Sequence, residues 1–500
     1  MNLAHLLDGH DPDRLAVISR HRAITYGELA DQVGRVRGGL VAAGVAPGDR
    51  VAIACGNNRS FVVAYLAALG AGAVVVPLNP ASPAPELARE LGVVTPSAVV
   101  LDPSAVATWR TLPPAATASV RLTVVAEGDG LPGAVSLDEL RAAEPAPVVA
   151  VDADTVAVMM FTSGTAGAPR AAMLTHGNLR ANLEQMDSAD ERLLPSDVVY
   201  GVLPLFHIFG LNVMLGGALR AGAAVLLVQR FDPATAADSI AQRGVTVVPG
   251  APPMWVAFST FDDLPADAFA TVRLALSGAS RLPASAAERM RARFGVDVKE
   301  GYGLTEAGPV VTSSTGGGRP GSVGRVLDGQ EVRLVDPLGQ PVLVGDAGEI
   351  WVRGANVFTG YFGDVEATAR VLTDDGWLRT GDLATVDDDG YLYLVDRVKD
   401  LIIVSGFNVF PAEVEEVLGA HPAVAEVGVI GVPHPHDGEA VKAFVVLAPG
   451  AHTDEDSLID YAHDFLARYK CPSKVVFVDE LPRHATGKLV RRHLGSSVLS

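Results

Sequence analysis

The sequence predicts an α/β protein with a large N-terminal domain of layered α/β subdomains, a β-rich subdomain and a small α+β C-terminal domain. Three observations predict this fold class. In residues 24–101 and 155–277, helical periods alternate with short apolar runs, which is typical of helices packed on a mostly parallel sheet. Residues 319–394 instead show short strands with close turns. In residues 400–500, short strands alternate with helices again.

Length and composition indicate a globular enzyme-sized chain. The 500 residues correspond to roughly three compact units, and 49% of them are hydrophobic while 19% are charged. The 39 Lys and Arg against 58 Asp and Glu give a net charge of −19, so we expect no nucleic-acid partner. Cys55 and Cys471 lie far apart in the sequence, which argues against a disulfide framework or a multi-cysteine zinc site and indicates a reducing compartment.

Neither the N-terminus nor the longest apolar stretch predicts a membrane segment. Residues 1–14 contain three aspartates and no apolar run, so no secretory signal is expected. Residues 61–78 carry no charge and approach the length that crosses a bilayer. Because Gly70 and Gly72 interrupt this stretch, we interpret it as a buried helix, a glycine turn and a buried strand. We therefore expect a cytoplasmic protein without an integral membrane span.

The elements of the N-terminal α/β region follow from apolar periodicity. Helical segments repeat their apolar residues at the 3.6-residue period, and the strands are short runs of Val, Ile, Leu and Ala bounded by Gly, Pro or polar residues. The expected elements are a helix within 26–43, a helix beginning at 85, and strands at 50–54, 73–76, 98–101, 155–161, 198–203, 223–228, 245–249 and 272–277.

The later part of the chain predicts a β-rich subdomain followed by a separate small domain. Strands are expected at 332–335, 348–352, 384–386 and 391–394, and then at 401–404, 424–430 and 442–446. Helices are expected at 411–418 and 456–467. The change of pattern places the domain boundary at 396–399, between a large domain of residues 1–395 and a small domain of residues 400–500.

A loop rich in hydroxyl groups and glycine is the strongest local motif. It reads Phe161-Thr162-Ser163-Gly164-Thr165-Ala166-Gly167-Ala168-Pro169-Arg170 and lies between an apolar strand and a helix that begins near His176. Backbone N–H and side-chain O–H groups in such a loop can converge on phosphate oxygens. It is not a Walker A loop, because no Gly-Lys-Ser/Thr follows. By itself, the motif could also be a flexible turn.

Further motifs follow this loop in a characteristic order. They are Gly301-Tyr302-Gly303-Leu304-Thr305-Glu306, Thr380-Gly381-Asp382-Leu383, Asp396-Arg397-Val398-Lys399-Asp400 and Pro482-Arg483-His484-Ala485-Thr486-Gly487-Lys488. The ordered set resembles the AMP-forming adenylating superfamily, which includes acyl- and aryl-CoA synthetases, peptide-synthetase adenylation domains and firefly-type luciferases. The resemblance covers nearly the whole chain, from Thr25-Tyr26-Gly27-Glu28-Leu29 to Lys488.

The resemblance implies an ATP site in the large domain, in which the 162–167 loop wraps the β- and γ-phosphates. Tyr302 is expected to stack on adenine, and Asp382 to accept both ribose hydroxyls with Arg397 close by. Thr162 and Glu306 are expected to hold Mg²⁺, since a hard cation prefers oxygen ligands. The residues implied for ATP or AMP binding are Thr162, Ser163, Gly164, Thr165, Ala166, Gly167, Gly278, Ala279, Ser280, Gly301, Tyr302, Gly303, Thr305, Asp382 and Arg397.

The catalytic residues that the resemblance implies are Lys488, Glu306, His207 and Arg170. Lys488 is expected to bridge the substrate carboxylate and the α-phosphate, where a positive charge offsets the negative charge that develops at phosphorus. His207 is expected to line the acyl site.

The same resemblance implies a small domain that rotates between two half-reactions. Lys399 is the expected hinge, because a few linker residues can absorb the backbone change. The rotation would remove Lys488 and bring the CoA-binding residues Ser405, Gly406 and Phe407 to the adenylate, with Gly406 allowing a pantetheine chain to pass close to the backbone.

Several of these residues have structural interpretations as well. Lys488 lies in a basic segment, so it could belong to a solvated face. Asp382 could cap a turn, Glu306 could be an acid at a helix N-terminus, and His207 could be a core histidine.

The phosphate-binding region departs from the family pattern at several positions. Many members have lysine where this chain has Ala168 and Arg170, and glycine where it has Ala171. A lysine that some relatives carry at the position of Ile403 is also absent. Arg170 keeps the positive charge on a planar, bulkier group. These departures bear on the affinity for ATP, not on the reaction class.

The motifs look most like those of bacterial fatty-acid CoA ligases. Residues 208–215 and 249–255, which are expected to line the acyl pocket, are apolar and contain no Arg or Lys to pair with a second carboxylate. We therefore predict a Mg²⁺-dependent ligase that uses ATP and CoA as co-substrates to activate a medium- or long-chain fatty acid. Alternatives are a ligase for an aromatic or specialised acid, a ligase that loads an acyl carrier protein, and a non-enzymatic binding homologue.

Overall fold

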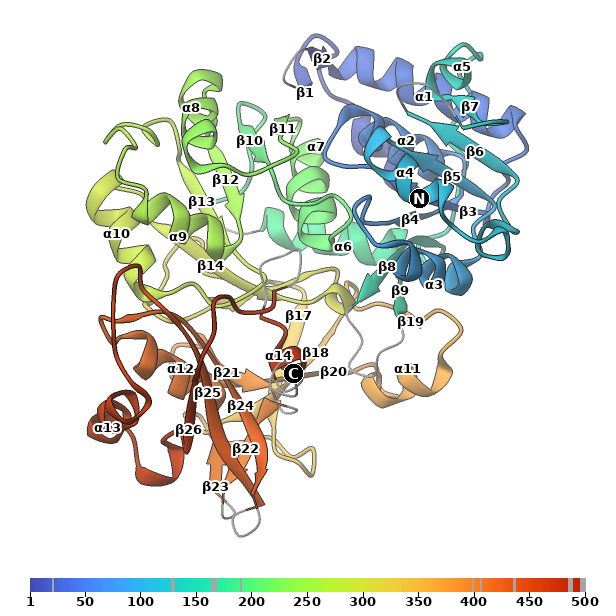
Figure 1. Ribbon diagram of the computed structural model, residues 1–500. Coiled ribbons are helices and arrows are strands. Elements are labelled where there is room, and N and C mark those ends of the chain that lie inside the picture. Colours follow the sequence, from blue (N-terminus) through green and yellow to red (C-terminus); the bar gives the residue numbers. More distant parts are fainter. Residues whose placement is uncertain are drawn as a thin grey trace. The chain divides into compact units, whose positions relative to one another are not determined.

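The structure is a computed structural model that describes residues 1–19, 22–126, 131–162, 169–188, 191–397, 400–404, 407–434, 438–483 and 489–494 (Figure 1). Contacts between Cα atoms divide the chain into two compact units. Unit 1 comprises residues 1–331 and 352–378, and unit 2 comprises residues 332–351 and 379–500.

Unit 1 contains a nine-stranded sheet whose central strands are parallel. The antiparallel neighbours β15 and β16 at one edge and β2 at the other complete it. In spatial order the strands are β16 (Arg325–Val326), β15 (Val310–Ser313), β14 (Val298–Gly303), β13 (Leu274–Ser277), β12 (Val247–Gly250), β10 (Val198–Gly201), β11 (Ala224–Leu227), β1 (Leu15–Ile18) and β2 (Ala23–Thr25).

An eight-stranded sheet also belongs to unit 1, and it carries both ends of the phosphate loop. Its strands are parallel except where β9 pairs antiparallel with β8 and β19. In spatial order they are β19 (Gly360–Tyr361), β9 (Arg170–Thr175), β8 (Val156–Thr162), β4 (Val74–Pro77), β3 (Arg50–Ala54), β5 (Ala98–Leu101), β6 (Leu122–Val125) and β7 (Val135–Ser136).

Helices connect and cover these strands, and α2 packs beside β3 and β4 while α1 packs against α2 (Figure 1). The helices of unit 1 are η1 (Leu3–Leu7), α1 (Tyr26–Ala42), α2 (Arg59–Gly70), α3 (Ala84–Val94), α4 (Pro103–Arg110), η2 (Pro114–Thr117), α5 (Leu137–Arg141), α6 (His176–Asp187), η3 (Phe209–Gly216), α7 (Gly217–Ala221), α8 (Pro233–Arg243), α9 (Pro252–Thr260), α10 (Ala284–Phe294), η4 (Thr305–Ala307) and α11 (Val365–Val371).

Helix starts and the apolar core of unit 1 have clear sequence causes. Thr25 caps α1 in a capping box with Glu28, which satisfies backbone N–H groups that the helix leaves unpaired. Helix α2 is buried on nearly all sides, and β4 is wholly buried after the turn at Gly72. The 61–78 stretch is therefore a helix, a turn and a strand, as expected. Among the described residues, no helix is long and apolar enough to span a bilayer.

Unit 2 contains a five-stranded sheet and most residues of a four-stranded sheet, while residues 330–331, 352–354 and 378 of the latter are counted with unit 1. A four-stranded sheet has the order β17 (Gln330–Val335), β18 (Gly348–Gly354), β20 (Leu378–Val386) and β21 (Leu392–Arg397). A five-stranded sheet comprises β23 (Phe407–Val409), β22 (Ile402–Val404), β25 (Gly438–Leu447), β24 (Val424–His434) and β26 (Lys474–Phe477). Its helices are α12 (Pro411–Gly419), α13 (Glu455–Phe465), η6 (Arg468–Lys470) and α14 (Arg491–Leu494).

The predicted fold class is confirmed: the protein is a mixed α/β chain with a large N-terminal part and a smaller C-terminal part that contains β-sheets.

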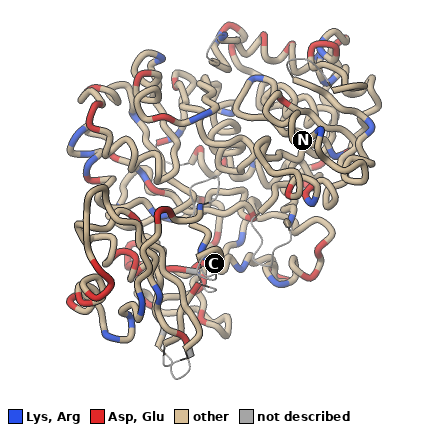
Figure 2. The backbone as a smooth tube through the Cα atoms, viewed as in Figure 1, with Lys and Arg blue, Asp and Glu red and all other residues tan. Residues whose placement is uncertain are grey.

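The boundary between the two units differs from the predicted domain boundary. Residues 332–351 and 379–395 are grouped with the C-terminal residues, whereas the sequence pattern assigned them to the large domain. A hinge at 396–399 stays a prediction, and residues 398–399 lie outside the described residues. Figure 2 shows basic and acidic residues interspersed along the chain.

Candidate functional site

Both ends of the predicted phosphate loop are fixed on neighbouring strands. Thr162 is the last residue of β8, Arg170 is the first residue of β9, and the two are paired across the antiparallel ladder. The chain therefore leaves and re-enters the sheet at one point. Ser163, Gly164, Thr165, Ala166 and Gly167 lie outside the described residues, as does Ala168.

The Arg170 side chain is held by an acidic residue and an aromatic ring. Its Nε donates to Asp364 Oδ2 over 3.1 Å, and its Cζ lies 5.7 Å from the centroid of the Tyr361 ring. Asp364 also caps α11, because its Oδ1 accepts the backbone N–H of Ala367 over 2.9 Å. The Ala367 N–H and the Arg170 guanidinium together hold the pKa of Asp364 below its usual range, so this carboxylate stays ionised.

Glu306 lies next to the same ring. The Tyr361 hydroxyl donates to Glu306 Oε1 over 2.7 Å, and the Phe358 N–H donates to the Glu306 carbonyl oxygen over 2.9 Å. Tyr361 belongs to β19, where it pairs with Ala172 of β9. Burial, with the negative charge of Glu306, raises the pKa of Tyr361, so the phenol keeps its proton and remains a donor. Arg170, Tyr361, Glu306 and Asp364 thus form one connected cluster.

The chemistry of the predicted metal ligands fits Mg²⁺. A hydroxyl from Thr162 and a carboxylate from Glu306 are hard oxygen donors, and Mg²⁺ usually takes few protein groups together with water and phosphate oxygens. Within the described ranges, no cluster of three or more His, Cys, Asp or Glu residues could form a metal site from protein groups alone. A cation held by Thr162 and Glu306 would screen the charge of a triphosphate.

The turn formed by the predicted nucleotide-binding residues Gly278, Ala279 and Ser280 follows β13. Ala279 has φ +74°, a left-handed conformation that is uncommon for a residue with a Cβ and often marks a functional turn. A Cβ at Gly278 would lie 3.0 Å from Phe209 Cε1, so glycine at this position leaves room for the Phe209 ring close to the backbone. Ser280 completes the turn and is exposed.

The Gly301–Glu306 motif runs from β14 into η4. Tyr302 is buried, and its N–H donates to Thr312 Oγ1 over 3.2 Å. A Cβ at Gly303 would lie 2.1 Å from the Pro309 carbonyl oxygen, which explains glycine there. Gly301 pairs with Ser313, and Thr305 begins η4 directly before Glu306.

The segment around His207 is fixed by a buried amide. Asn57 Nδ2 donates to the carbonyl oxygens of Gly201 and Leu203, and Asn57 Oδ1 accepts the Leu205 N–H. His207 Nδ1 accepts the N–H of Phe209 over 3.2 Å, so a neutral His207 carries its proton on Nε2. The Asn57 contacts therefore hold the backbone that presents His207.

The predicted acyl-pocket stretches contain a π-helix and a buried tryptophan. Helix η3 is a π-helix, a form often found at functional sites. Within it, Phe209 and Val213 are half-buried, while its other residues are buried. Trp255 of α9 is fully buried, and its Nε1 donates to the Leu276 carbonyl oxygen over 3.2 Å. Trp255 belongs to the core cluster that includes Phe258.

In unit 2, Asp382 of β20 pairs with Arg397 of β21, and the Asp382 N–H donates to Thr380 Oγ1 over 3.1 Å. This pairing brings the two predicted ribose residues to one point of the sheet. Phe407 is 56% exposed and stacks on Tyr469, with 4.8 Å between the ring centroids. The remaining predicted residues lie outside the described ranges: Lys399, Ser405, Gly406 and Lys488.

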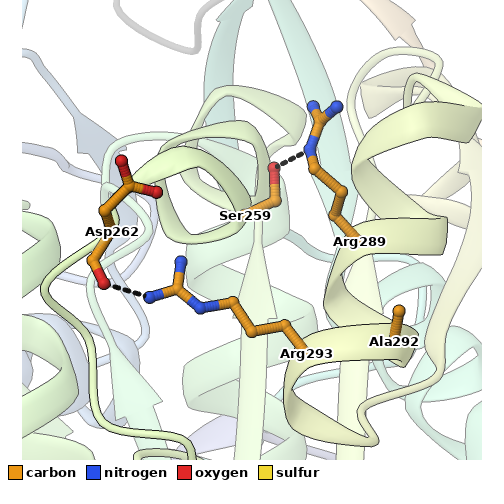
Figure 3. A pocket seen from close by; sticks show the side chains of 5 residues that line it. All are labelled: Ser259, Asp262, Arg289, Ala292 and Arg293. Atoms are coloured by element: carbon orange, nitrogen blue, oxygen red, sulfur yellow. Dashed lines mark hydrogen bonds between the residues drawn. The ribbon is translucent and has the colours of Figure 1, made fainter.

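A separate pocket lies beside α9 and α10 (Figure 3). Its lining residues are Ser259, Asp262, Arg289, Ala292 and Arg293. Arg289 Nε donates to Ser259 Oγ over 3.3 Å, and Arg293 donates to the Phe261 carbonyl oxygen over 2.7 Å. These arginines tie the end of α9 to α10, and the pocket contains none of the residues predicted to bind nucleotide or acid.

Tyr361 and Asp364 were not among the residues predicted from the sequence to form the site. They follow a stretch whose apolar residues show neither a helical nor a strand period. Their partners Arg170 and Glu306 lie far away in the sequence, so no local pattern joins them. The one local signal is the Asp364 N-cap position before α11, which predicts a helix start and nothing about Arg170.

Comparisons with known proteins agree with the arrangement of these motifs. Residues 8–362 match the family model for AMP-binding enzymes, and residues 413–488 match that for the AMP-binding enzyme C-terminal domain. A feruloyl-CoA synthase from an Amycolatopsis species is 41% identical, covering 97% of this chain and 96% of its own. 4-Coumarate–CoA ligase 5 from Oryza sativa subsp. japonica is 34% identical, covering 94% of this chain and 89% of its own.

The solved structures include a close match in both fold and sequence. The crystal structure of ATP-bound MatB from Rhodopseudomonas palustris superposes with a TM-score of 0.92 at 37% identity, covering 99% of each chain. Motif order, family models and relatives along nearly the whole chain lead to one assignment. The chain belongs to the AMP-binding enzyme family, and its class is that of the AMP-forming acid–CoA ligases.

Proposed function

We propose that this protein is an ATP-dependent CoA ligase for an aromatic carboxylic acid of the hydroxycinnamate type. The observation that carries the proposal is the similarity to feruloyl-CoA synthase and 4-coumarate–CoA ligase along nearly the whole chain. The relatives thus favour the aromatic alternative over the medium- or long-chain fatty acid that the sequence analysis put first.

The first half-reaction forms an acyl-adenylate. A carboxylate oxygen of the acid attacks the α-phosphorus of ATP, and the bond from this phosphorus to the bridging oxygen of pyrophosphate breaks. Arg170 and the 162–167 loop bind the leaving phosphates, while Lys488 balances the charge at the α-phosphate. Thr162 and Glu306 would hold Mg²⁺.

The second half-reaction transfers the acyl group. The CoA thiolate attacks the acyl carbon, and the bond from this carbon to the AMP oxygen breaks, so AMP leaves. Rotation about Lys399 replaces Lys488 by residues 405–407 at the adenylate. An acyl carrier protein is the other acceptor that fits this chemistry, because its pantetheine thiol is the same nucleophile.

The apolar wall around η3 supports an uncharged, ring-sized acyl group. Phe209 and Val213 are half-buried, and His207 is the polar side chain beside them. A ring stacked on Phe209 would gain aromatic packing, whereas a second carboxylate would find no cation in residues 203–216. A fatty acid is the second candidate, because the same apolar wall would accept an alkyl chain.

The test compares kcat/KM for ferulate, 4-coumarate, cinnamate, benzoate, malonate, decanoate and palmitate, with pyrophosphate and AMP release as readouts. We expect the maximum at a hydroxycinnamate, at least about tenfold above palmitate, which corresponds to about 1.4 kcal/mol. A maximum at decanoate, palmitate or malonate would overturn the proposal. A holo carrier protein in place of CoA tests the acceptor.

A variant of the apolar wall tests its location. If Val213 lines the acyl site, Val213→Phe should lower kcat/KM for ferulate more than for the smaller benzoate, because overpacking penalises the larger ligand. The matched control is Val344→Phe, at a side chain that is 60% exposed in unit 2. Equal losses for ferulate and benzoate would show that Val213 does not line the acyl site.

A further inference from the structure

The guanidinium of Arg170 is held on one edge and one face. Its Nε donates to Asp364 Oδ2, and its Cζ lies over the Tyr361 ring at 5.7 Å from the centroid. The side chain is 21% exposed. Among the residues that the structure describes, the two terminal nitrogens of Arg170 make no hydrogen bond. The Nε side of the guanidinium is therefore bound to Asp364, while the four N–H groups on Nη1 and Nη2, here called the terminal fork, can donate to a ligand.

Arg170 borders the predicted phosphate loop in the sequence. Arg170 is paired with Thr162 across β8 and β9, so it is the residue at which the loop returns to the sheet. A planar guanidinium can bind a carboxylate through Nε and a phosphate through its terminal nitrogens at the same time. A lysine ammonium has one nitrogen and cannot divide these tasks between two edges.

We propose that Asp364 and Tyr361 are positioning residues that orient Arg170, so that its terminal N–H groups clamp the phosphates of ATP. Asp364 fixes the Nε edge, and the Tyr361 ring supports one face. This inference rests on the ATP-dependent part of the proposed function and is independent of the acid that is activated.

The same tyrosine connects the clamp to the predicted metal carboxylate. The Tyr361 hydroxyl donates to Glu306 Oε1 over 2.7 Å, while its ring supports Arg170. Tyr361 is buried and itself fixed on β19 by pairing with Ala172. One side chain thus contacts both the cation of Arg170 and the carboxylate of Glu306, the two groups that the resemblance assigns to the ATP site.

Asp364 also has a purely structural role, which the test must separate. It caps α11 through the Ala367 N–H, and asparagine caps helices about as well as aspartate. Asp364→Asn therefore keeps the cap and removes the charge that pairs with Arg170. The matched control is Asp232→Asn, because Asp232 caps α8 through the Thr235 N–H.

The experiment measures the dissociation constant of ATP by titration calorimetry without acid, and the KM values for ATP and ferulate. For Asp364→Asn we expect the ATP dissociation constant and KM to rise about tenfold, with KM for ferulate and the melting temperature unchanged. Asp232→Asn should leave ATP binding unchanged. Tyr361→Leu should weaken ATP binding several-fold, and more than Tyr361→Phe, which keeps the ring beside Arg170 and loses only the hydroxyl that donates to Glu306.

A double-mutant cycle decides whether the effect passes through Arg170. In the Arg170→Ala background, Asp364→Asn should have no further effect on ATP binding. An additive effect, or equal changes in KM for ATP and ferulate, would overturn the inference. Failure of the proposed acid specificity is distinguishable, because the wild-type protein would then bind ATP normally in calorimetry and release no pyrophosphate with aromatic acids.

Discussion

Asn356 Nδ2 donates a 2.7 Å hydrogen bond to the carbonyl oxygen of Ala307, the residue that follows Glu306. Asn356 is fully buried, and it also accepts from Gln185 Nε2 and donates to Gln330 Oε1, each over 3.1 Å. A second amide, Asn212 of the π-helix, donates to the Gly308 carbonyl oxygen over 2.8 Å. Buried side-chain amides from distant elements therefore fix the backbone that carries Glu306.

Asn356→Ala should lower both stability and adenylation. The change leaves the Ala307 carbonyl and the amide of Gln185 without this partner, and a buried polar group left unpaired costs about 1–3 kcal/mol. We expect a lower melting temperature and a lower kcat for pyrophosphate release. The control is Gln340→Ala, an exposed amide. A variant with the wild-type melting temperature and kcat would show that the network does not hold Glu306.

Glu90 should make stability depend on pH near neutrality. Its side chain is buried in α3, its Oε2 has no hydrogen-bond partner among the described residues, and burial together with the charge of Glu86 raises its pKa to about 7. Because the pKa of Glu90 is higher in the folded than in the unfolded protein, folding favours the protonated carboxyl. The contribution of Glu90 to the free energy of unfolding is therefore fully present at low pH and is lost as pH rises through about 7.

Glu90→Gln should therefore be neutral at pH 5 and more stable than the wild type at pH 8. Ionising a buried carboxyl costs about 3 kcal/mol for such a shift, and glutamine avoids this cost. Thermal unfolding at pH 5, 6, 7 and 8 measures the difference. Glu288→Gln, at an exposed position in α10, should show no pH-dependent gain. An equal effect of Glu90→Gln at pH 5 and pH 8 would contradict the prediction.

Arg491 should anchor the segment that carries Lys488. Arg491 Nη2 donates to Glu415 Oε2 over 2.7 Å and Oε1 over 2.9 Å, and its Nη1 donates to Asp400 Oδ2 over 3.3 Å. Leu489, which follows Lys488, forms a bridge with Arg483. Arg491→Lys loses the forked geometry, so we expect adenylation to fall about tenfold while acyl transfer from presynthesised acyl-AMP to CoA is retained.

Lys488→Ala is the reference for this prediction, with a loss of about 10²–10³ in adenylation alone. Lys474→Gln, at an exposed lysine of β26, should leave both half-reactions unchanged. If Arg491→Lys slows both half-reactions equally, Arg491 stabilises unit 2 without a specific effect on Lys488.

The regular elements could be predicted because their causes are local. The strands at 50–54 and 98–101 have the predicted bounds, since a short apolar run between turn residues is sufficient to specify a buried strand. The π-helix at Phe209–Gly216 was not predicted, because its apolar residues do not distinguish it from a strand or an α-helix. Strand β19 was also missed, since two residues show no period.

The family, the reaction class and the order of the motifs follow from the sequence, because contiguous residues such as Thr162–Arg170 and Gly301–Glu306 carry that information. The folded chain was needed to show that Arg170, Tyr361, Glu306 and Asp364 form one cluster. The pairing of β19 with β9 joins positions that lie far apart in the chain. Such contacts depend on sheet registration and side-chain packing across the fold, which no local pattern of residues specifies.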